Sequence, residues 1–190
     1  MRITGGQFRG RALSEPADNR VRPTSDKVRQ AIFNILTHHA FEEFTLVGAK
    51  VIDVFAGTGA LGIEALSRGA EYALFIDDSA ESRAIIRKNV EALSLTGITK
   101  IWRRDAAALG PLGAGAGGPF NLAFLDAPYR NGLTQKALAG LTAGGWLAPH
   151  ALVVAETAAD EHIEAPAGFT LLDARNYGDT RVQTYGVSPG

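Results

Sequence analysis

The sequence contains no cysteine and no long apolar run, and each absence excludes a class of protein. Without cysteine the chain has no disulfide, no thiolate metal site and no cysteine nucleophile. No segment approaches the roughly 18 consecutive apolar residues of a membrane span, and the arginine-bearing start lacks the apolar region of a signal peptide. A large excess of positive charge is also lacking: the formal net charge is -1, which argues against a polycation that coats nucleic acid. We therefore expect a soluble, cytoplasmic protein.

The 190 residues, 46% of them hydrophobic, can bury one substantial core. Basic side chains gather at the start of the chain, because residues 1–30 hold seven basic and three acidic groups, and the remaining residues are acidic overall. The stretch "MRITGGQFRGRAL" is broken by glycines and favours an extended arm over a helix. We therefore expect a basic, β-rich arm or hairpin over residues 1–24 and one domain over residues 25–190.

The remaining pattern predicts an α/β fold. A helix is predicted over about residues 26–36, with Thr24 or Ser25 as its N-cap. From residue 50, short apolar strands alternate with helical segments, which indicates a mostly parallel, seven-stranded sheet with helices on both faces. Residues 107–119 are rich in Gly, Ala and Pro and predict a loop, whereas residues 169–187 predict an antiparallel hairpin that closes the sheet.

The stretch "VIDVFAGTGALGIEAL" carries the first chemical signal. Gly57, Gly59 and Gly62 form a G-x-G-x-x-G motif between a predicted strand and a predicted helix, and Asp77 ends the next strand. Such glycines let the backbone approach a nucleotide, and an acid in the place of Asp77 can accept hydrogen bonds from ribose hydroxyls. The alternative is that the glycines only form a tight turn between strand and helix.

The acid Asp53, four residues before Gly57, discriminates between cofactors. A carboxylate beside a pyrophosphate is unfavourable, which argues against NAD, whereas S-adenosylmethionine has no phosphate and carries an ammonium and a sulfonium. Asp53 could instead only cap the backbone N–H groups of the loop. Asp105, at the end of the third strand, could accept from the adenine amino group. The expected cofactor-binding residues are Asp53, Phe55, Gly57, Gly59, Asp77, Asp105 and Ala106.

The stretch "NLAFLDAPYRN" ends an apolar strand in Asp126, Ala127, Pro128 and Tyr129, and we expect these four to be catalytic. In a doubly wound sheet they would lie in the ligand crevice beside the first strand. The Asp126 carboxylate and the Ala127 carbonyl could accept both hydrogens of a base amine, Pro128 would stiffen the turn, and the Tyr129 ring could stack on the base. The alternative is an ordinary strand-end acid before a proline turn.

These motifs together resemble one family. The stretches "MRITGGQFRGRAL", "RPTSDKVRQAIFNIL", "DVFAGTGALGIEALSRGA" and "LDAPYRNG" are similar, in order and spacing, to the bacterial family that methylates N2 of one guanine in 16S ribosomal RNA. The resemblance implies a class I methyltransferase fold (Rossmann-like), S-adenosylmethionine as the donor, and an N-terminal basic extension that grips RNA. One position departs from the family, because Ala127 stands where the motif usually has its first proline.

The expected reaction is direct methyl transfer to guanine N2 of 16S rRNA within an assembling small subunit, by a monomer without a metal. The target base must leave its stack to reach Asp126. The expected phosphate contacts are Arg2, Arg9, Arg11, Arg22 and Arg29, although these arginines could also form a solvated face without a partner. Three alternatives stay open: an adenine amino-methyltransferase acting on DNA or another RNA, an NAD-dependent oxidoreductase, and a non-catalytic RNA-binding module.

Overall fold

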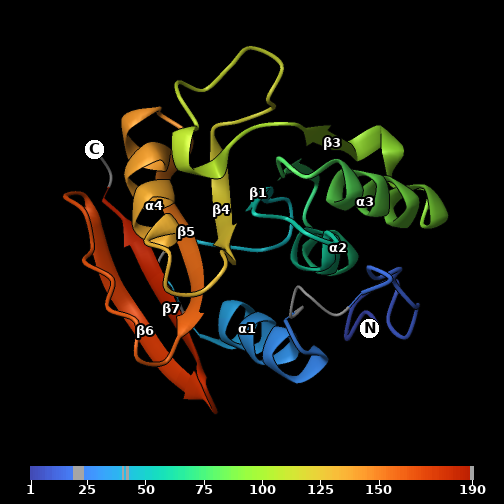
Figure 1. The fold of residues 1–190 in the computed structure, drawn as a ribbon, viewed down its shortest axis with the longest axis horizontal. Coiled ribbons are helices and arrows are strands. Elements are labelled where there is room, and N and C mark those ends of the chain that lie inside the picture. Colours follow the sequence, from blue (N-terminus) through green and yellow to red (C-terminus); the bar gives the residue numbers. More distant parts are fainter. Residues whose placement is uncertain (19–23, 40, 42, 189–190) are drawn as a thin grey trace.

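A seven-stranded sheet forms the centre of the computed structural model, which describes residues 1–18, 24–39, 41 and 43–188 (Figure 1). The strand order is β3-β2-β1-β4-β5-β7-β6. Neighbours from β3 to β5 are parallel, whereas β7 runs antiparallel to both β5 and β6. The strands are β1 (Lys50–Val54), β2 (Tyr72–Ile76), β3 (Thr99–Trp102), β4 (Phe120–Leu125), β5 (Leu147–Ala158), β6 (Phe169–Tyr177) and β7 (Thr180–Val187).

The helices alternate with these strands, as the sequence predicts. They are α1 (Asp26–His38), α2 (Ala60–Ser67), α3 (Ala80–Ala92) and α4 (Leu133–Ala143), with short 3-10 turns η1 (Thr96–Ile98) and η2 (Ala106–Ala108). The predicted mostly parallel sheet and its C-terminal antiparallel hairpin are confirmed. No helix in the described parts of the chain is long and apolar enough to cross a membrane.

Alternate residues of the central strands face two separate cores, because successive side chains of a strand point to opposite faces. On one face, Val51 of β1 and Phe124 of β4 belong to the core that also contains Phe33 of α1 and residues of α2 and α3. On the other face, Ile52 of β1 packs in the core that contains Leu138 of α4. Both faces of the central strands are therefore covered, which leaves the ends of these strands open to ligands.

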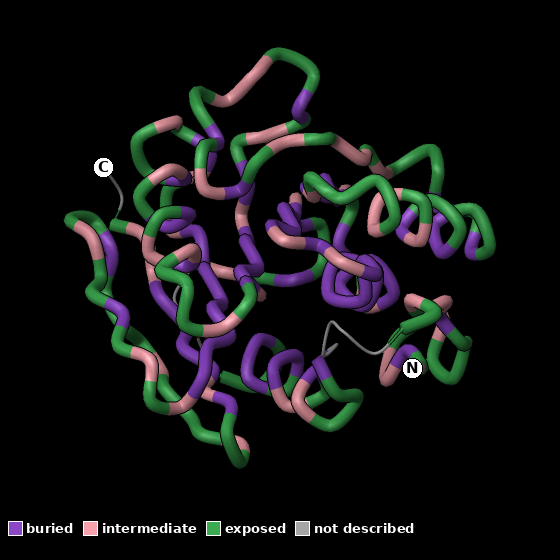
Figure 2. Tube along the Cα trace, in the orientation of Figure 1, coloured by how far each residue is buried: buried purple, intermediate pink, exposed green. Residues whose placement is uncertain are grey.

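The N-terminal arm covers the outer side of α2, which is why all eight residues of this helix are buried (Figure 2). The arm turns back on itself through a single antiparallel bridge between Arg2 and Ala12 and forms no named strand, so it is less regular than the expected hairpin. Ile3 and Leu13 of the arm are buried in the core of this face. Sequence reasoning gave these two residues no core role, because the glycines around them dominate the local pattern.

Glu64 of α2 fixes the arm in place. Its side chain is fully buried and accepts hydrogen bonds from the backbone N–H groups of Thr4 and Gly5, both at 2.9 Å. It also forms ion pairs with Arg29 of α1, at 3.1 Å, and with Arg68, at 2.9 Å. One carboxylate therefore joins the arm, α1 and α2, which pack in the same core on one face of the sheet.

Candidate active site

A cavity of about 570 Å³ opens where the carboxyl ends of β1, β2 and β4 meet. Each of these strands contributes an acid near its end, namely Asp53, Asp77 and Asp126. The cavity is also lined by expected site residues from the loops that follow the strands: Phe55, Gly57, Ala127, Pro128 and Tyr129. The two predicted motifs, far apart in the sequence, thus lie in one cavity, because the carboxyl ends of parallel strands share an edge of the sheet.

The lining of this cavity is strongly acidic. Among the described residues that line it, six are acidic and none is Lys, Arg or His. The six are Asp18, Asp53, Asp77, Asp78, Glu81 and Asp126. A ligand with a pyrophosphate would meet like charge here, whereas a ligand with an ammonium and a sulfonium meets opposite charge. The donor set therefore fits S-adenosylmethionine and not NAD.

The glycine loop after β1 needs a left-handed backbone. Phe55, Gly57 and Gly59 have positive φ values of 59°, 60° and 81°. The Gly57 N–H donates to Asp77 Oδ2 at 2.9 Å, which ties the loop to the end of β2. Gly59 is the N-cap of α2 and does not itself line the cavity.

Gly62, the third glycine of the motif, has a packing role. A Cβ atom added to Gly62 would lie 2.5 Å from Cε1 of Phe75 in β2, so only glycine lets α2 approach the sheet this closely. Its N–H donates to Asp53 Oδ2 at 3.0 Å. The capping alternative for Asp53 is therefore realised in part, since this acid both caps the helix start and lines the cavity.

Asp77 and Asp105 differ in their placement. Asp77 accepts from the backbone N–H groups of Gly57 and Ser79, both at 2.9 Å, which fixes its carboxylate at the cavity. Asp105 caps the turn η2 by accepting from Ala107 N at 2.9 Å, and neither Asp105 nor Ala106 is among the cavity-lining residues. The structure thus does not bring Asp105 and Ala106 together with the other expected cofactor residues.

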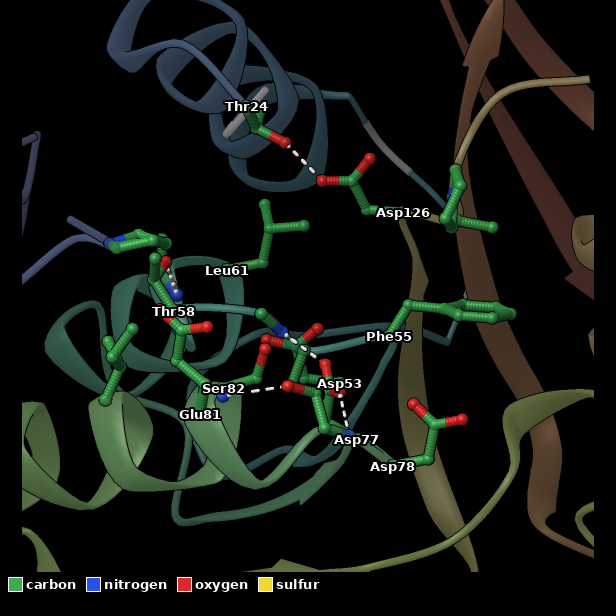
Figure 3. A pocket seen from close by; sticks show the side chains of 18 of the residues that line it. Thr24, Asp53, Phe55, Thr58, Leu61, Asp77, Asp78, Glu81, Ser82 and Asp126 are labelled. Carbon is green, nitrogen blue, oxygen red and sulfur yellow. Dashed lines mark hydrogen bonds between the residues drawn. The ribbon is translucent and has the colours of Figure 1, made fainter. Parts of the chain in front are cut away.

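Asp126 is held at the end of β4 by a residue from another element. Its Oδ2 atom accepts a hydrogen bond from the Thr24 hydroxyl at 2.6 Å. Figure 3 shows these two side chains turned toward each other, apart from the group of Asp53 and Asp77. The hydroxyl of Tyr129 lies 3.1 Å from Glu156 Oε1 and 2.9 Å from the Thr180 hydroxyl. Ala127 is buried, whereas Pro128 is exposed.

Sequence reasoning missed Thr24 and Glu156. The sequence pattern offers Thr24 only as a helix cap. In the structure Ser25 is the N-cap of α1 and accepts from Val28 N at 3.2 Å, so the Thr24 side chain is left to contact Asp126. Glu156 lies in the apolar strand β5 with 6% of its surface exposed. An acid inside an apolar strand was the available signal, since buried acids concentrate at functional sites.

Two of the six cavity acids, Asp53 and Asp126, favour the neutral form until a cation enters. Burial raises the pKa of Asp53 to about 8; the Gly62 N–H opposes this rise and the nearby Asp77 carboxylate adds to it. Burial, followed by the charge of Glu156, raises the pKa of Asp126 well above its ordinary value. Burial also raises the pKa of the Tyr129 hydroxyl to about 12. Opposite charge in the cavity would favour the ionised carboxylates.

The expected RNA-binding arginines divide into three groups. Arg2, Arg9 and Arg11 are exposed on the arm, although Arg2 donates to the Gly10 carbonyl at 2.8 Å. Arg22 lies outside the described residues. Arg29 corrects the sequence prediction: its side chain is fully buried and its guanidinium contacts Glu64, Asp26 and the Arg2 carbonyl, so it has no surface for a phosphate.

Comparison with known proteins gives the family. The family described as "Conserved hypothetical protein 95" matches residues 1–186. The chain belongs to this family. It is 37% identical over 187 residues to "Ribosomal RNA small subunit methyltransferase D" of Escherichia coli K12, covering 97% of this chain and 89% of that protein. It is 31% identical to the protein of the same name from Haemophilus influenzae, with 97% and 93% covered.

Solved structures agree with this assignment. The chain superimposes on the Escherichia coli protein yhhF with a TM-score of 0.83 and 32% identity, covering 100% of this chain and 99% of that one. An RNA methyltransferase from Salinibacter ruber, solved in complex with S-adenosyl-L-homocysteine, gives a TM-score of 0.62 at 14% identity, with 88% and 95% covered. At that identity the likeness concerns the fold alone. The predicted methyltransferase fold and the predicted family resemblance are confirmed.

Proposed function

We propose that this protein transfers a methyl group from S-adenosylmethionine to the exocyclic N2 amine of a guanine in 16S ribosomal RNA of the small subunit. The observation that carries the proposal is a cavity lined by acids without a cationic side chain, in which Asp126, Ala127, Pro128 and Tyr129 adjoin the glycine loop. The small-subunit rRNA substrate is supported by the names of the two curated relatives.

The cofactor would be held by the loop and acids around β1 and β2. Asp53 and Asp77 present carboxylates to a cationic, phosphate-free ligand, and the left-handed backbone at Gly57 lets the chain approach it. When bound, S-adenosylmethionine supplies a methyl group on a positively charged sulfur, which is an electrophile for an amine. Phe55 lines the same cavity and offers an apolar surface.

The acceptor amine would be held at the end of β4. Its lone pair is delocalised into the base, so the amine must be turned by acceptors for its two hydrogens. Asp126 Oδ1 has no hydrogen-bond partner within the described part of the chain, while Oδ2 is fixed by Thr24. Asp126 Oδ1 and the Ala127 carbonyl would accept the two hydrogens, the Tyr129 ring would stack on the base, and Asp126 would hold the proton that the amine loses.

The RNA itself would be gripped by the exposed arm. Arg2, Arg9 and Arg11 lie on the segment that Glu64 fastens to α2, which would place their charges on a rigid support. We also infer that the protein acts in the cytoplasm as a monomer on an assembling subunit, without a metal. In the described ranges no three His, Cys, Asp or Glu residues gather as a metal ion requires.

The test is to identify the methylated nucleoside. The protein would be mixed with methyl-labelled S-adenosylmethionine and unmodified small subunits or free 16S rRNA, and the digested RNA analysed by mass spectrometry. Label in N2-methylguanosine is expected. Label in N6-methyladenosine would support the adenine alternative, because the same acceptor arrangement serves any exocyclic amine; no label on any RNA, despite cofactor binding, would contradict the proposal.

A further inference from the structure

A single hydroxyl joins two carboxyl groups in the active site. Thr24 Oγ1 lies 2.6 Å from Asp126 Oδ2 and 2.6 Å from Glu156 Oε2. A threonine hydroxyl has one proton and can donate to only one of these oxygens. The second contact is a hydrogen bond only if the other carboxyl group supplies a proton and the hydroxyl oxygen accepts it. The geometry thus requires one proton in addition to that of Thr24.

The surroundings favour the same arrangement. Thr24 and Glu156 are each 6% exposed, so two ionised carboxylates this close would repel each other in a place that solvates them poorly. One shared proton leaves the pair with a single negative charge. If Thr24 donates to Asp126 and protonated Glu156 donates to Thr24, then Asp126 is ionised and can accept from an amine.

Glu156 also contacts the other side of the catalytic turn. Its Oε1 atom accepts from the Tyr129 hydroxyl, which in turn lies within hydrogen-bond distance of Thr180. Glu156 and Tyr129 both line a second cavity of about 470 Å³ between the start of α1 and the β6–β7 turn. Glu156 is therefore not an isolated core residue, because it connects the groups expected to hold the amine and the ring.

The backbone of Thr24 is held in place by Arg29. Its backbone carbonyl accepts from Nη1 of the buried Arg29 at 3.4 Å, and the next residue caps α1. The ion pair of Arg29 with Glu64 thereby extends to the active site.

We propose that Glu156 and Thr24 are positioning residues of the methyl-transfer site. The Thr24 hydroxyl links Asp126 and Glu156 into a pair that holds one proton, and Glu156 also fixes the Tyr129 hydroxyl. This inference rests on the proposed function for its catalytic meaning, but the shared proton is a property of the protein alone. Among the residues that the structure describes, the ionisable groups around the pair include Asp53 of β1, Tyr129 of the β4 turn and Arg29 of α1, and Lys27 of α1 lines the second cavity together with Glu156.

Substitutions of Glu156 and Thr24 distinguish a shared proton from a purely structural role of these residues. In Glu156→Gln the amide N–H can donate to Thr24 and the amide oxygen can accept from Tyr129, so both of these contacts have a replacement while the titratable group is lost. Glu156→Ala removes both contacts. Thr24→Val removes the link at nearly constant volume, and Thr24→Ser restores the hydroxyl. Glu164→Gln is the matched control, because Glu164 is an exposed glutamate in the loop after β5.

The deciding measurement is an NMR titration of the Asp126 carboxyl carbon in the full-length protein and these variants. In the wild type the Asp126 carbon should titrate in two steps, because it also senses Glu156, and Glu156→Gln should keep only the step at lower pH, since a neutral amide replaces the protonated Glu156 carboxyl. Glu164→Gln should leave both steps unchanged. A wild-type Asp126 titration with a single step that is the same in Glu156→Gln, or the loss of a step in Glu164→Gln, would overturn the inference.

Methyl-transfer rates form the second readout. The acid limb of kcat should stay in place in Glu156→Gln, whose neutral amide replaces the protonated Glu156 carboxyl, and Glu156→Ala should lose on the order of 100-fold in kcat with unchanged S-adenosylmethionine affinity, as expected when catalytic groups are misplaced. Thr24→Ser should be active where Thr24→Val is impaired. A wild type that shows the coupled titration but methylates no RNA would refute the proposed function and leave the shared proton established; equal kcat in Glu156→Ala and wild type would overturn the positioning role.

Discussion

The guanidinium of Arg29 and the carboxylate of Glu64 form an ion pair with an Nε–Oε1 distance of 3.1 Å, and neither side chain is accessible to solvent. Removal of one partner leaves the other as a buried, uncompensated charge, which costs about 3–5 kcal/mol. We therefore expect Glu64→Ala to lower the free energy of unfolding by about this amount, as measured by urea denaturation. A loss below about 1 kcal/mol, the value of an exposed pair, would contradict this account.

Gly62 should tolerate no side chain. In Gly62→Ala the new Cβ would lie 2.5 Å from Cε1 of Phe75, and overpacking of this kind costs about 1–3 kcal/mol. The control is Gly97→Ala in η1, where a Cβ atom meets nothing within 4 Å. Urea unfolding of both variants measures the difference. Equal stability of the two variants would show that the sheet and α2 are not packed as described.

Asp53 should be unfavourable for stability and favourable for cofactor binding. Its pKa is raised from 3.8 to about 8, so between these pH values Asp53 is protonated in the folded state and ionised in the unfolded state. The free energy of unfolding therefore falls as the pH rises from about 4 to 8. One pKa unit corresponds to about 1.4 kcal/mol. Asp53→Asn should therefore raise the free energy of unfolding of the ligand-free protein, with the larger gain at pH 8 than at pH 5. An equal effect at the two pH values would contradict the raised pKa.

The same group should make cofactor binding depend on pH. A cation in the cavity favours the ionised carboxylate, so affinity for S-adenosylmethionine should increase as pH rises toward about 8, with release of a proton on binding. Calorimetry in two buffers of different ionisation enthalpy measures that proton. In Asp53→Asn the affinity should fall and the pH dependence should weaken; a variant with unchanged affinity and proton release would exclude Asp53 from the cofactor site.

The exposed arm should contribute charge rather than sequence recognition. Arg9→Ala should weaken RNA binding and reduce the slope of log K against log salt by about 1 for each phosphate contact removed. Lys136→Ala is the control, because Lys136 is exposed on α4, which packs on the opposite face of the sheet from the arm. Fluorescence anisotropy with a labelled 16S rRNA fragment measures both. An equal loss in the two variants would indicate nonspecific attraction to the whole surface.

The sequence predicted the parts of the site that depend on chain-local signals. The glycine spacing, the acid at each strand end and the alternation of strands and helices suffice to place Asp53, Asp77 and Asp126 at one edge of the sheet, as observed. Local signals could not show that Arg29 is buried, because its partner Glu64 is 35 residues away and its position on α1 suits an exposed residue equally well. Thr24 and Glu156 were missed for the same reason, since their contact spans 132 residues.

The most direct test of the central claim compares binding and transfer in Asp126→Ala. The claim is that Asp126 acts on the acceptor amine and not on the cofactor. S-adenosylmethionine affinity, measured by calorimetry, should stay within about twofold of the wild type, whereas single-turnover methyl transfer to small subunits should fall by at least about 100-fold. Retained transfer in a folded Asp126→Ala variant would contradict the account.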